Sequence, residues 1–195
     1  MMTKGINLKQ KQFKQRVFSF CLLVLMFGST VHAQGVYLPG SGLPAFKLTM
    51  PDSPEVIAYL GMKGVKTFSL SQIPTKFIVI EFFSCFCEHC QGNVPTINRL
   101  YQVIRNDQEL NKEMKMIGVG LFSGEKEIEL FKKKFKTVYP LFADPQGDIQ
   151  KKTKIIAVPL TLVVDLNGKI IMNHSGTITD LDAFLMELRK KTKSR

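Results

Sequence analysis

The stretch that decides the fold is FIVIEFFSCFCEHC, residues 77–90. Its first half, residues 77–83, is apolar on both faces except at Glu81, which is the pattern of a central parallel strand covered on both sides. Its second half ends in Cys87-Glu88-His89-Cys90, and apolar residues then recur at helical spacing to about Arg105. The stretch therefore predicts a buried strand, a turn that carries two thiols, and a helix that begins at those thiols.

Outward from this stretch, the hydrophobic pattern predicts a mixed sheet with helices on both of its faces. Residues 116–122 form a second apolar run, and an amphipathic helix with Ile128, Phe131 and Phe135 on one side follows it. The dipeptide Asn167-Gly168 predicts a tight hairpin between two further strands. The remaining expected elements are short strands at 45–48, 65–70 and 138–142, a helix at 148–154, hairpin strands at 160–164 and 169–173, and a C-terminal helix with its apolar stripe over 181–188. Strands that alternate with helices in this way indicate the α/β class.

The first 33 residues differ in composition from the rest of the chain. Five basic residues precede an apolar run from Val17 to Val31, and no acidic residue occurs before Asp52. This run of about 15 residues is shorter than the roughly 20 that a membrane-spanning helix needs, and a small-x-small pattern ends at Ala33. The pattern predicts a signal peptide over residues 1–33, cleaved after Ala33, and one domain over residues 34–195. The alternative is an uncleaved N-terminal anchor, and both place the domain outside the cytoplasm, in the periplasm or an equivalent compartment.

The formal net charge of +11 comes partly from this leader, which carries five of the 27 basic residues and none of the 16 acidic ones, so that its removal leaves +6. The remaining excess lies in three lysine-rich runs with few aromatic residues among them, at 132–136, 151–154 and 189–195. Nucleic acid binding would be indicated by a basic stripe with stacking aromatics or by a groove-reading motif, and the sequence has neither. Solvated helix faces account for the runs, and no nucleic acid partner is expected.

Cys87 and Cys90 are the candidate reactive groups. Of the four cysteines, Cys21 falls in the leader, and the other three lie within six residues, which excludes a framework of disulfides between distant loops. Two thiols three residues apart at the start of a helix can form a reversible disulfide. Free backbone N–H groups and the positive helix end favour the thiolate of Cys87, which we expect to attack a partner disulfide as the nucleophile. Cys90, one turn further inward, would resolve the mixed disulfide, and the two electrons move without a cofactor.

Three titratable residues lie near this pair in the sequence. His89 would stabilise the thiolate if it is protonated or donates towards the sulfur, whereas Glu88 adds an opposing negative charge. Glu81 lies in the buried strand, where it either exchanges a proton with the Cys90 sulfur or is a hydrogen-bonded buried residue without a catalytic role. The residues alone leave both readings of Glu81 open.

Two motifs far apart in the sequence resemble one known family. Residues 82–90 match its aromatic-rich approach to a CxxC motif, and Val158-Pro159 matches the proline that faces the disulfide. The lead-in at 43–48 and the ending at 162–170 are also similar. From about Gly42 to the C-terminus, the chain resembles the thioredoxin superfamily, and within it the exported TlpA/ResA-like thiol-disulfide oxidoreductases related to the redoxins.

The resemblance implies a thioredoxin-like fold, in which a mixed sheet is flanked by helices on both faces, and the activity of a protein disulfide reductase. It implies that Cys87 attacks, that Cys90 resolves, and that Glu81 is the buried acid behind the second cysteine. The implied partners are protein thiols and disulfides of the cell envelope, such as the haem-site cysteines of apocytochromes, and an upstream dithiol donor in the membrane. We expect a monomer that uses no cofactor and no metal.

The same resemblance implies a partner-binding groove shaped by Val158 and by Pro159 in the cis state, with Phe86 beside the reactive pair. A proline ahead of an exposed strand edge leaves neighbouring backbone groups free to pair with an extended substrate. The sequence departs from the family pattern at four positions: Phe83 and Phe86 replace the usual tryptophans, Asn93 stands where Glu is frequent, and Leu160 follows the proline where Thr is common. These departures leave partner identity and reduction potential open.

Cys85 is the least expected residue of the cluster and supports two readings. It is either a small buried residue beside the site or a thiol that competes in disulfide exchange or bonds to another chain. The three cysteines and His89 would also be soft ligands for copper or zinc, although their crowding disfavours a closed four-ligand site. A thiol peroxidase, the other alternative, would carry Pro and Thr ahead of its reactive cysteine, where this chain has Ile80 and Ser84.

Overall fold

The computed structural model describes residues 37–193. The predicted signal peptide over residues 1–33 and its cleavage site lie outside the described residues. Within residues 37–193, no helix combines the length and the apolar character that crossing a lipid bilayer requires.

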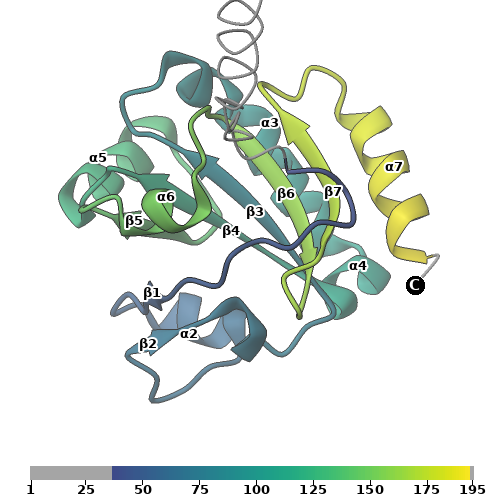
Figure 1. Cartoon of the computed structure of the whole chain (residues 1–195), viewed down its shortest axis with the longest axis horizontal. Coiled ribbons are helices and arrows are strands. Elements are labelled where there is room, and N and C mark those ends of the chain that lie inside the picture. Colours follow the sequence, from purple (N-terminus) through teal and green to yellow (C-terminus); the bar gives the residue numbers. More distant parts are fainter. Residues whose placement is uncertain (1–36, 194–195) are drawn as a thin grey trace, which may run out of the picture. The chain divides into compact units, whose positions relative to one another are not determined.

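A five-stranded mixed sheet forms the centre of the fold (Figure 1). Its strands, in spatial order, are β5 (Leu141–Asp144), β4 (Met114–Leu121), β3 (Phe77–Phe83), β6 (Leu160–Asp165) and β7 (Ile170–Ser175). β3, β4 and β5 run parallel, whereas β6 is antiparallel to β3 and β7 is antiparallel to β6. All seven residues of β3 are buried, because this strand has a neighbour on each edge and packed side chains on each face. The predicted mixed sheet around a buried central strand is confirmed.

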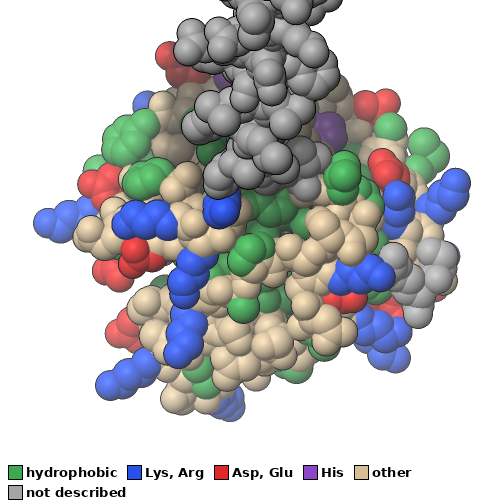
Figure 2. Space-filling model, in the orientation of Figure 1, with side chains coloured by type: hydrophobic (Ala, Val, Ile, Leu, Met, Phe, Trp, Pro, Cys, Tyr) green, Lys and Arg blue, Asp and Glu red, His purple; other side chains and the backbone are tan. Residues whose placement is uncertain are grey.

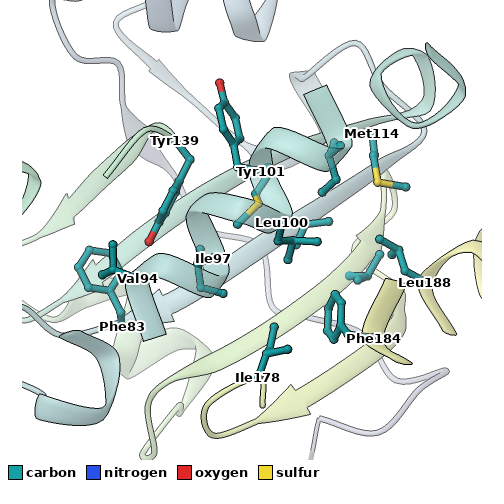
Figure 3. Packing of buried hydrophobic residues seen from close by; sticks show 14 of the residues in the cluster. Phe83, Val94, Ile97, Leu100, Tyr101, Met114, Tyr139, Ile178, Phe184 and Leu188 are labelled. Carbon is teal, nitrogen blue, oxygen red and sulfur yellow. The ribbon is translucent and has the colours of Figure 1, made fainter. Parts of the chain in front are cut away.

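Successive residues of β3 point to two different hydrophobic clusters, one on each face of the sheet. Three of its odd-numbered residues pack with α3 (Glu88–Asn106), α5 (Glu125–Phe135) and α7 (Leu181–Lys193). Its even-numbered residues pack with α2 (Pro54–Leu60) and α6 (Asp148–Thr153). Figure 3 shows part of the first cluster, to which α3 contributes Ile97 and Leu100 and α7 contributes Phe184 and Leu188. Helices therefore cover both faces, as the sequence predicted.

Some short elements differ from the prediction. They are the paired strands β1 (Leu48–Thr49) and β2 (Thr67–Phe68), the 3-10 helix η1 (Leu70–Gln72) and the helix α4 (Gln108–Glu113). Helices α2 and α4 were not predicted, although Ser53 and Asp107 cap their N-termini through side-chain hydrogen bonds. The strand expected at 138–142 begins only at Leu141, because Pro140 has no N–H to donate to a neighbouring strand.

Charged side chains of both signs are interspersed on the face that Figure 2 shows. Helix α5 illustrates the arrangement: Glu125 and Glu127 lie in its first turn, and the exposed lysines 132–134 lie in its last turn. Negative charge near the helix N-terminus and positive charge near the C-terminus both complement the helix dipole. This lysine-rich run is therefore the solvated end of a helix.

Gly118 on β4 leaves space that neighbouring side chains fill. A Cβ atom at this position would lie 2.6 Å from Leu141 Cδ2 and 2.8 Å from the ring of Tyr139. We expect Gly118→Ala to lower the free energy of unfolding by about 1 to 3 kcal/mol, because the core must shift to admit the methyl group. Chemical denaturation followed by circular dichroism measures this loss.

Gly92 on α3 offers the matched control, because a Cβ atom there would meet nothing within 4 Å. Gly92→Ala is expected to raise the free energy of unfolding by up to about 1 kcal/mol, since alanine is the better helix former. Equal losses of stability in the two variants would contradict the packing argument.

Candidate active site

Cys87 lies at the N-terminus of α3, directly after the turn that follows β3. It is the N-cap residue of the helix, and its sulfur accepts a hydrogen bond from the backbone N–H of Cys90 at 3.2 Å. The backbone N–H of Cys87 donates to the carbonyl of Ser84 at 3.2 Å, which closes the turn. Cys87 is half-buried, whereas Cys90 is buried with 3% of its surface exposed. The helix start therefore presents one sulfur at the surface and holds the other in the core.

The buried Cys90 thiol holds its proton strongly. Burial raises the pKa of the Cys90 thiol well above its usual range, and its hydrogen bond to the Cys87 sulfur and the charges of Cys87 and Glu81 raise it further. A backbone hydrogen bond from Ser84 acts in the opposite direction. Cys90 therefore keeps its proton near neutral pH. Its N–H and its S–H both face Cys87 Sγ, where they can stabilise negative charge.

The Val158–Pro159 peptide bond is cis, as the resemblance implied. The carbonyl oxygen of Val158 lies 3.7 Å from Cys87 Sγ, within reach of the Cys87 thiol as donor. The carbonyl of Pro159 accepts a hydrogen bond from the backbone N–H of Gly176 at 2.8 Å. Pro159 is buried and Val158 is half-buried, so this loop forms a wall of the site beside the more exposed sulfur.

Glu81 is a buried carboxyl group on β3, with 2% of its surface exposed. Its Oε2 accepts a hydrogen bond from Thr161 Oγ1 at 2.5 Å, and its Oε1 accepts one from Asn93 Nδ2 at 3.3 Å. Burial raises the pKa of Glu81 to about 7, and the two hydrogen bonds, which favour the charged form, oppose that shift. The Glu81 charge acts on Cys90, and a carboxyl group that titrates near neutral pH is suited to exchange a proton with such a thiol.

Asn93 and Thr161 are members of the site that the sequence prediction did not find. Asn93 lies three residues after Cys90 on the buried side of α3 and is fully buried. Thr161 lies opposite Glu81 in the antiparallel pairing of β3 with β6. Helical spacing from Cys90 could have indicated Asn93, whereas Thr161 is found only once the register of the two strands is known.

Phe86, Glu88 and His89 lie on the exposed side of the site. The side chain of Phe86 is prominent, because 72% of this residue is accessible to solvent. In the part of the chain that the structure describes, neither Glu88 nor His89 forms a hydrogen bond to a cysteine sulfur. The two residues between the cysteines therefore face water.

Comparison with known sequences identifies the family. A sequence model described as the AhpC/TSA family matches residues 39–172. The chain belongs to the AhpC/TSA family. The match includes the cysteine motif, the strand that carries Glu81 and the cis-proline loop at Pro159.

Curated relatives of this AhpC/TSA-family chain are named thiol-disulfide oxidoreductases. ResA of Geobacillus thermodenitrificans is 24% identical over 174 residues, which span 89% of this chain and 93% of the relative. Sporulation thiol-disulfide oxidoreductase A of Bacillus subtilis is 26% identical over 131 residues, which span 65% of this chain and 76% of the relative. These findings confirm the resemblance to ResA-like proteins and the predicted class of activity, thiol-disulfide exchange.

Solved structures show the same fold. The thioredoxin domain of a thiol-disulfide oxidoreductase from Bacteroides vulgatus superposes with a TM-score of 0.59 at 18% identity, covering 78% of this chain and 99% of that domain. StoA from Bacillus subtilis superposes with a TM-score of 0.52 at 18% identity, covering 80% of this chain and all of StoA. The predicted thioredoxin-like fold is confirmed.

The third cysteine of this family member, Cys85, is buried with 8% of its surface exposed. Its backbone N–H donates to Ser123 Oγ at 3.2 Å, and its carbonyl accepts a hydrogen bond from Gln91 Nε2 at 2.9 Å. Burial raises the pKa of the Cys85 thiol, the charge of Glu127 raises it further, and a hydrogen bond with Ser123 lowers it. The geometry fits the reading of Cys85 as a small buried residue that packs beside the site.

The sequence left open a copper or zinc module whose ligands would be the three cysteines and His89. Among residues 37–193, no three or more His, Cys, Asp or Glu side chains are arranged to hold a metal ion. The candidate ligands differ in exposure, because Cys85 and Cys90 are buried whereas His89 is exposed.

Proposed function

We propose that this chain exchanges disulfides with protein partners outside the cytoplasm, through Cys87 as the nucleophile and Cys90 as the resolving thiol. The observation that carries the proposal is the pair of donors that Cys90 directs at Cys87 Sγ, its N–H at 3.2 Å and its own thiol. They distinguish the two sulfurs, because Cys87 is half-buried and accepts hydrogen bonds whereas Cys90 is buried and holds its proton. Attack followed by resolution needs an accessible sulfur with donors that stabilise negative charge on it, beside a buried thiol that keeps its proton until the second step.

In the proposed reaction, the Cys87 thiolate attacks one sulfur of a partner disulfide, and the other partner sulfur leaves as a thiolate. Cys90 then gives its proton to the ionised carboxyl group of Glu81 and attacks the Cys87 sulfur. The bond between Cys87 and the partner breaks, the second partner sulfur leaves, and a Cys87–Cys90 disulfide remains. Two electrons have passed to the partner, so an upstream dithiol donor must reduce the chain before the next cycle.

The partner segment is proposed to bind at Val158, Pro159 and Phe86. Support comes from the carbonyl of Val158, which lies 3.7 Å from Cys87 Sγ, and from the exposed ring of Phe86. An extended segment whose sulfur reaches Cys87 would meet backbone groups on one side and an apolar surface on the other. These are the contacts that extended peptides commonly use.

Glu88 is proposed to disfavour the Cys87 thiolate through its negative charge, and His89 to favour it when the imidazole is protonated or donates towards the sulfur. Both side chains are exposed in the first turn of α3. Water and salt screen exposed charges, so each of these two residues is expected to change the reactivity of Cys87 only modestly.

The proposed location is the periplasm or an equivalent compartment, and it rests on the leader sequence over residues 1–33. The proposed partners are cysteines of cell-envelope proteins, among them the haem-site cysteines of apocytochromes, which the enzyme would keep reduced. The proposed donor of electrons is a dithiol protein in the membrane, and the enzyme is proposed to act as a monomer.

A Cys90→Ser variant is expected to accumulate mixed disulfides with its partners, because the sulfur that resolves them is gone. The full chain is expressed in a bacterial host, the envelope fraction is quenched with acid and alkylated, and adducts are separated on non-reducing gels and identified by mass spectrometry.

N-terminal sequencing of the same material is expected to begin at Gln34.

Cys87→Ser is the matched control, since it removes the other sulfur by the same substitution. It is expected to yield no such adducts. Equal trapping by the two variants would contradict the assignment of Cys87 as the nucleophile.

A further inference from the structure

Asn93 is a fully buried amide among the hydrophobic side chains of α3. It lies on the inner side of α3 next to Val94 and near Ile97, and its side chain reaches Glu81 on β3. A buried polar side chain costs stability unless each polar atom finds a partner. The hydrogen-bond partners of Asn93 therefore determine whether its side chain donates to Glu81 or accepts from it.

Both ends of the Asn93 side chain are occupied, and the partners fix which end faces which group. The backbone N–H of Ile178 donates to Asn93 Oδ1 at 3.2 Å. Because an N–H can only donate, the oxygen of the amide must face Ile178, and the NH₂ group must face Glu81 Oε1, at 3.3 Å. Asn93 therefore donates a hydrogen bond to Glu81, and its orientation prevents it from accepting one from Glu81.

Thr161 completes the arrangement around Glu81. Its Oγ1 donates to Glu81 Oε2 at 2.5 Å, so each carboxylate oxygen receives one donor. A hydroxyl group can donate or accept, and Thr161 can therefore serve both the ionised and the protonated carboxyl group. Asn93 can only donate, and a donor favours the ionised form because a carboxylate is a stronger acceptor than a protonated carboxyl group.

We propose that Asn93 is a positioning residue for the resolving step, which holds the Glu81 carboxyl group in one orientation and favours its ionised form. The inference rests on the proposed function, in which Glu81 takes the proton of Cys90. Without Asn93, the acid would keep its own proton to higher pH and could accept one from Cys90 only in more alkaline solution.

Two titratable groups interact with Glu81, Cys90 on α3 and Tyr139 in the segment before β5. The charge of Glu81 acts on the Cys90 thiol. His174 on β7 is one strand further away, because Thr161 on β6 lies between His174 and Glu81 in the sheet. Tyr139, which precedes β5, packs over Gly118, the residue opposite Glu81 on β4, and Figure 3 shows its hydroxyl end directed towards Phe83 and Val94. Burial raises the pKa of Tyr139 well above its usual range, and the charges of Glu81, Cys90 and Cys85 raise it further, so the phenol stays neutral. His174 is half-buried and bonds through Nε2 to the carbonyl of Thr177.

The test is a titration of the Glu81 carboxyl carbon by nuclear magnetic resonance in the reduced protein. Asn93→Leu removes the donor, and we expect the titration midpoint of Glu81 to rise by about one pH unit. Thr161→Val removes the other donor and is expected to give a similar rise, whereas Thr161→Ser keeps a hydroxyl group and is expected to restore the wild-type midpoint.

Asn93→Asp is the second variant, in case loss of the Ile178 partner prevents Asn93→Leu from folding. It keeps an acceptor for the Ile178 N–H and replaces the donor to Glu81 by a carboxyl oxygen. Repulsion between the two carboxyl groups is expected to raise the Glu81 midpoint by more than one pH unit. A Glu81 midpoint unchanged in both Asn93 variants would overturn the proposal and leave Asn93 as a structural tie between α3 and Ile178.

The kinetic counterpart is the rate at which Cys90 resolves a mixed disulfide formed at Cys87 with a small thiol. At about pH 6, Asn93→Leu is expected to slow this step about tenfold, and well above neutral pH the rates of the variant and the wild type should converge. In a Glu81→Gln background the same substitution should have no further effect on the rate.

The kinetic measurement also separates this proposal from the proposed function. If the wild-type dithiol does not exchange at all, the proposed function fails, yet the Glu81 titration still reports whether Asn93 acts on the acid. If the dithiol exchanges normally and Asn93→Leu slows it equally at every pH, the positioning role is wrong and the function stands.

Discussion

Cys87→Ser is expected to lower the rate of protein disulfide reduction by at least about a thousandfold. A hydroxyl group is not ionised near neutral pH and cannot form a disulfide, whereas Cys87 Sγ receives the N–H of Cys90 at 3.2 Å and is half-buried. The reduction of insulin disulfides by the reduced protein, with a dithiol reagent as electron source, measures this rate. The uncatalysed reaction with the reagent alone is subtracted.

Cys85→Ser is the matched control, because it makes the same substitution two residues earlier at a buried position. Burial raises the pKa of Cys85, so its thiol is disfavoured as a nucleophile, and we expect a rate within about threefold of the wild type. A loss in Cys85→Ser as large as that in Cys87→Ser would show that exchange runs through Cys85 and that the proposed pair is wrong.

Glu81→Gln is expected to change how stability depends on pH. Because burial raises the pKa of Glu81 to about 7 from its ordinary value of 4.5, the folded state holds a proton between these values that the unfolded state releases. The contribution of Glu81 to stability is therefore fully present below the lower value and falls as pH rises through the window, by about 3 kcal/mol in all. Glutamine does not titrate. Between about pH 4.5 and about pH 8, the free energy of unfolding measured with denaturant should therefore fall by about 3 kcal/mol less in Glu81→Gln than in the wild type.

Glu88→Gln makes the same chemical change on an exposed side chain and is the control for Glu81→Gln. It is expected to leave the wild-type loss of stability in place. If the wild type and Glu81→Gln lose stability equally between the two pH values, then Glu81 does not hold its proton in the folded state. Its proposed part in the resolving step would then have no basis.

The reactive half of the site could be predicted because its signals are local. The spacing of Cys87 and Cys90 places both at the start of one helix, and Glu81 is the single polar residue in the apolar run of β3. The cis state of Pro159 came from the family resemblance and not from any local pattern, since most peptide bonds before proline are trans.

The hydrogen-bond partners of Glu81 could not be predicted, because they depend on long-range geometry. Thr161 lies 80 positions after Glu81 and meets it only through the antiparallel register of β3 with β6. The amide of Asn93 is oriented by the N–H of Ile178, which lies 85 positions further along the chain. No pattern of apolar spacing specifies such pairs. The helices α2 and α4 are a different case, because their capping residues Ser53 and Asp107 are visible in the sequence and could have indicated them.

The most direct test of the account is a map of the disulfide that the isolated chain forms when it is oxidised by glutathione disulfide. Free thiols are alkylated with one reagent, the disulfide is then reduced, and the released thiols are alkylated with a second reagent before tandem mass spectrometry. We predict that Cys87 and Cys90 carry the second label and that Cys85 carries the first. A disulfide that includes Cys85, or an oxidised chain without an internal disulfide, would contradict the account.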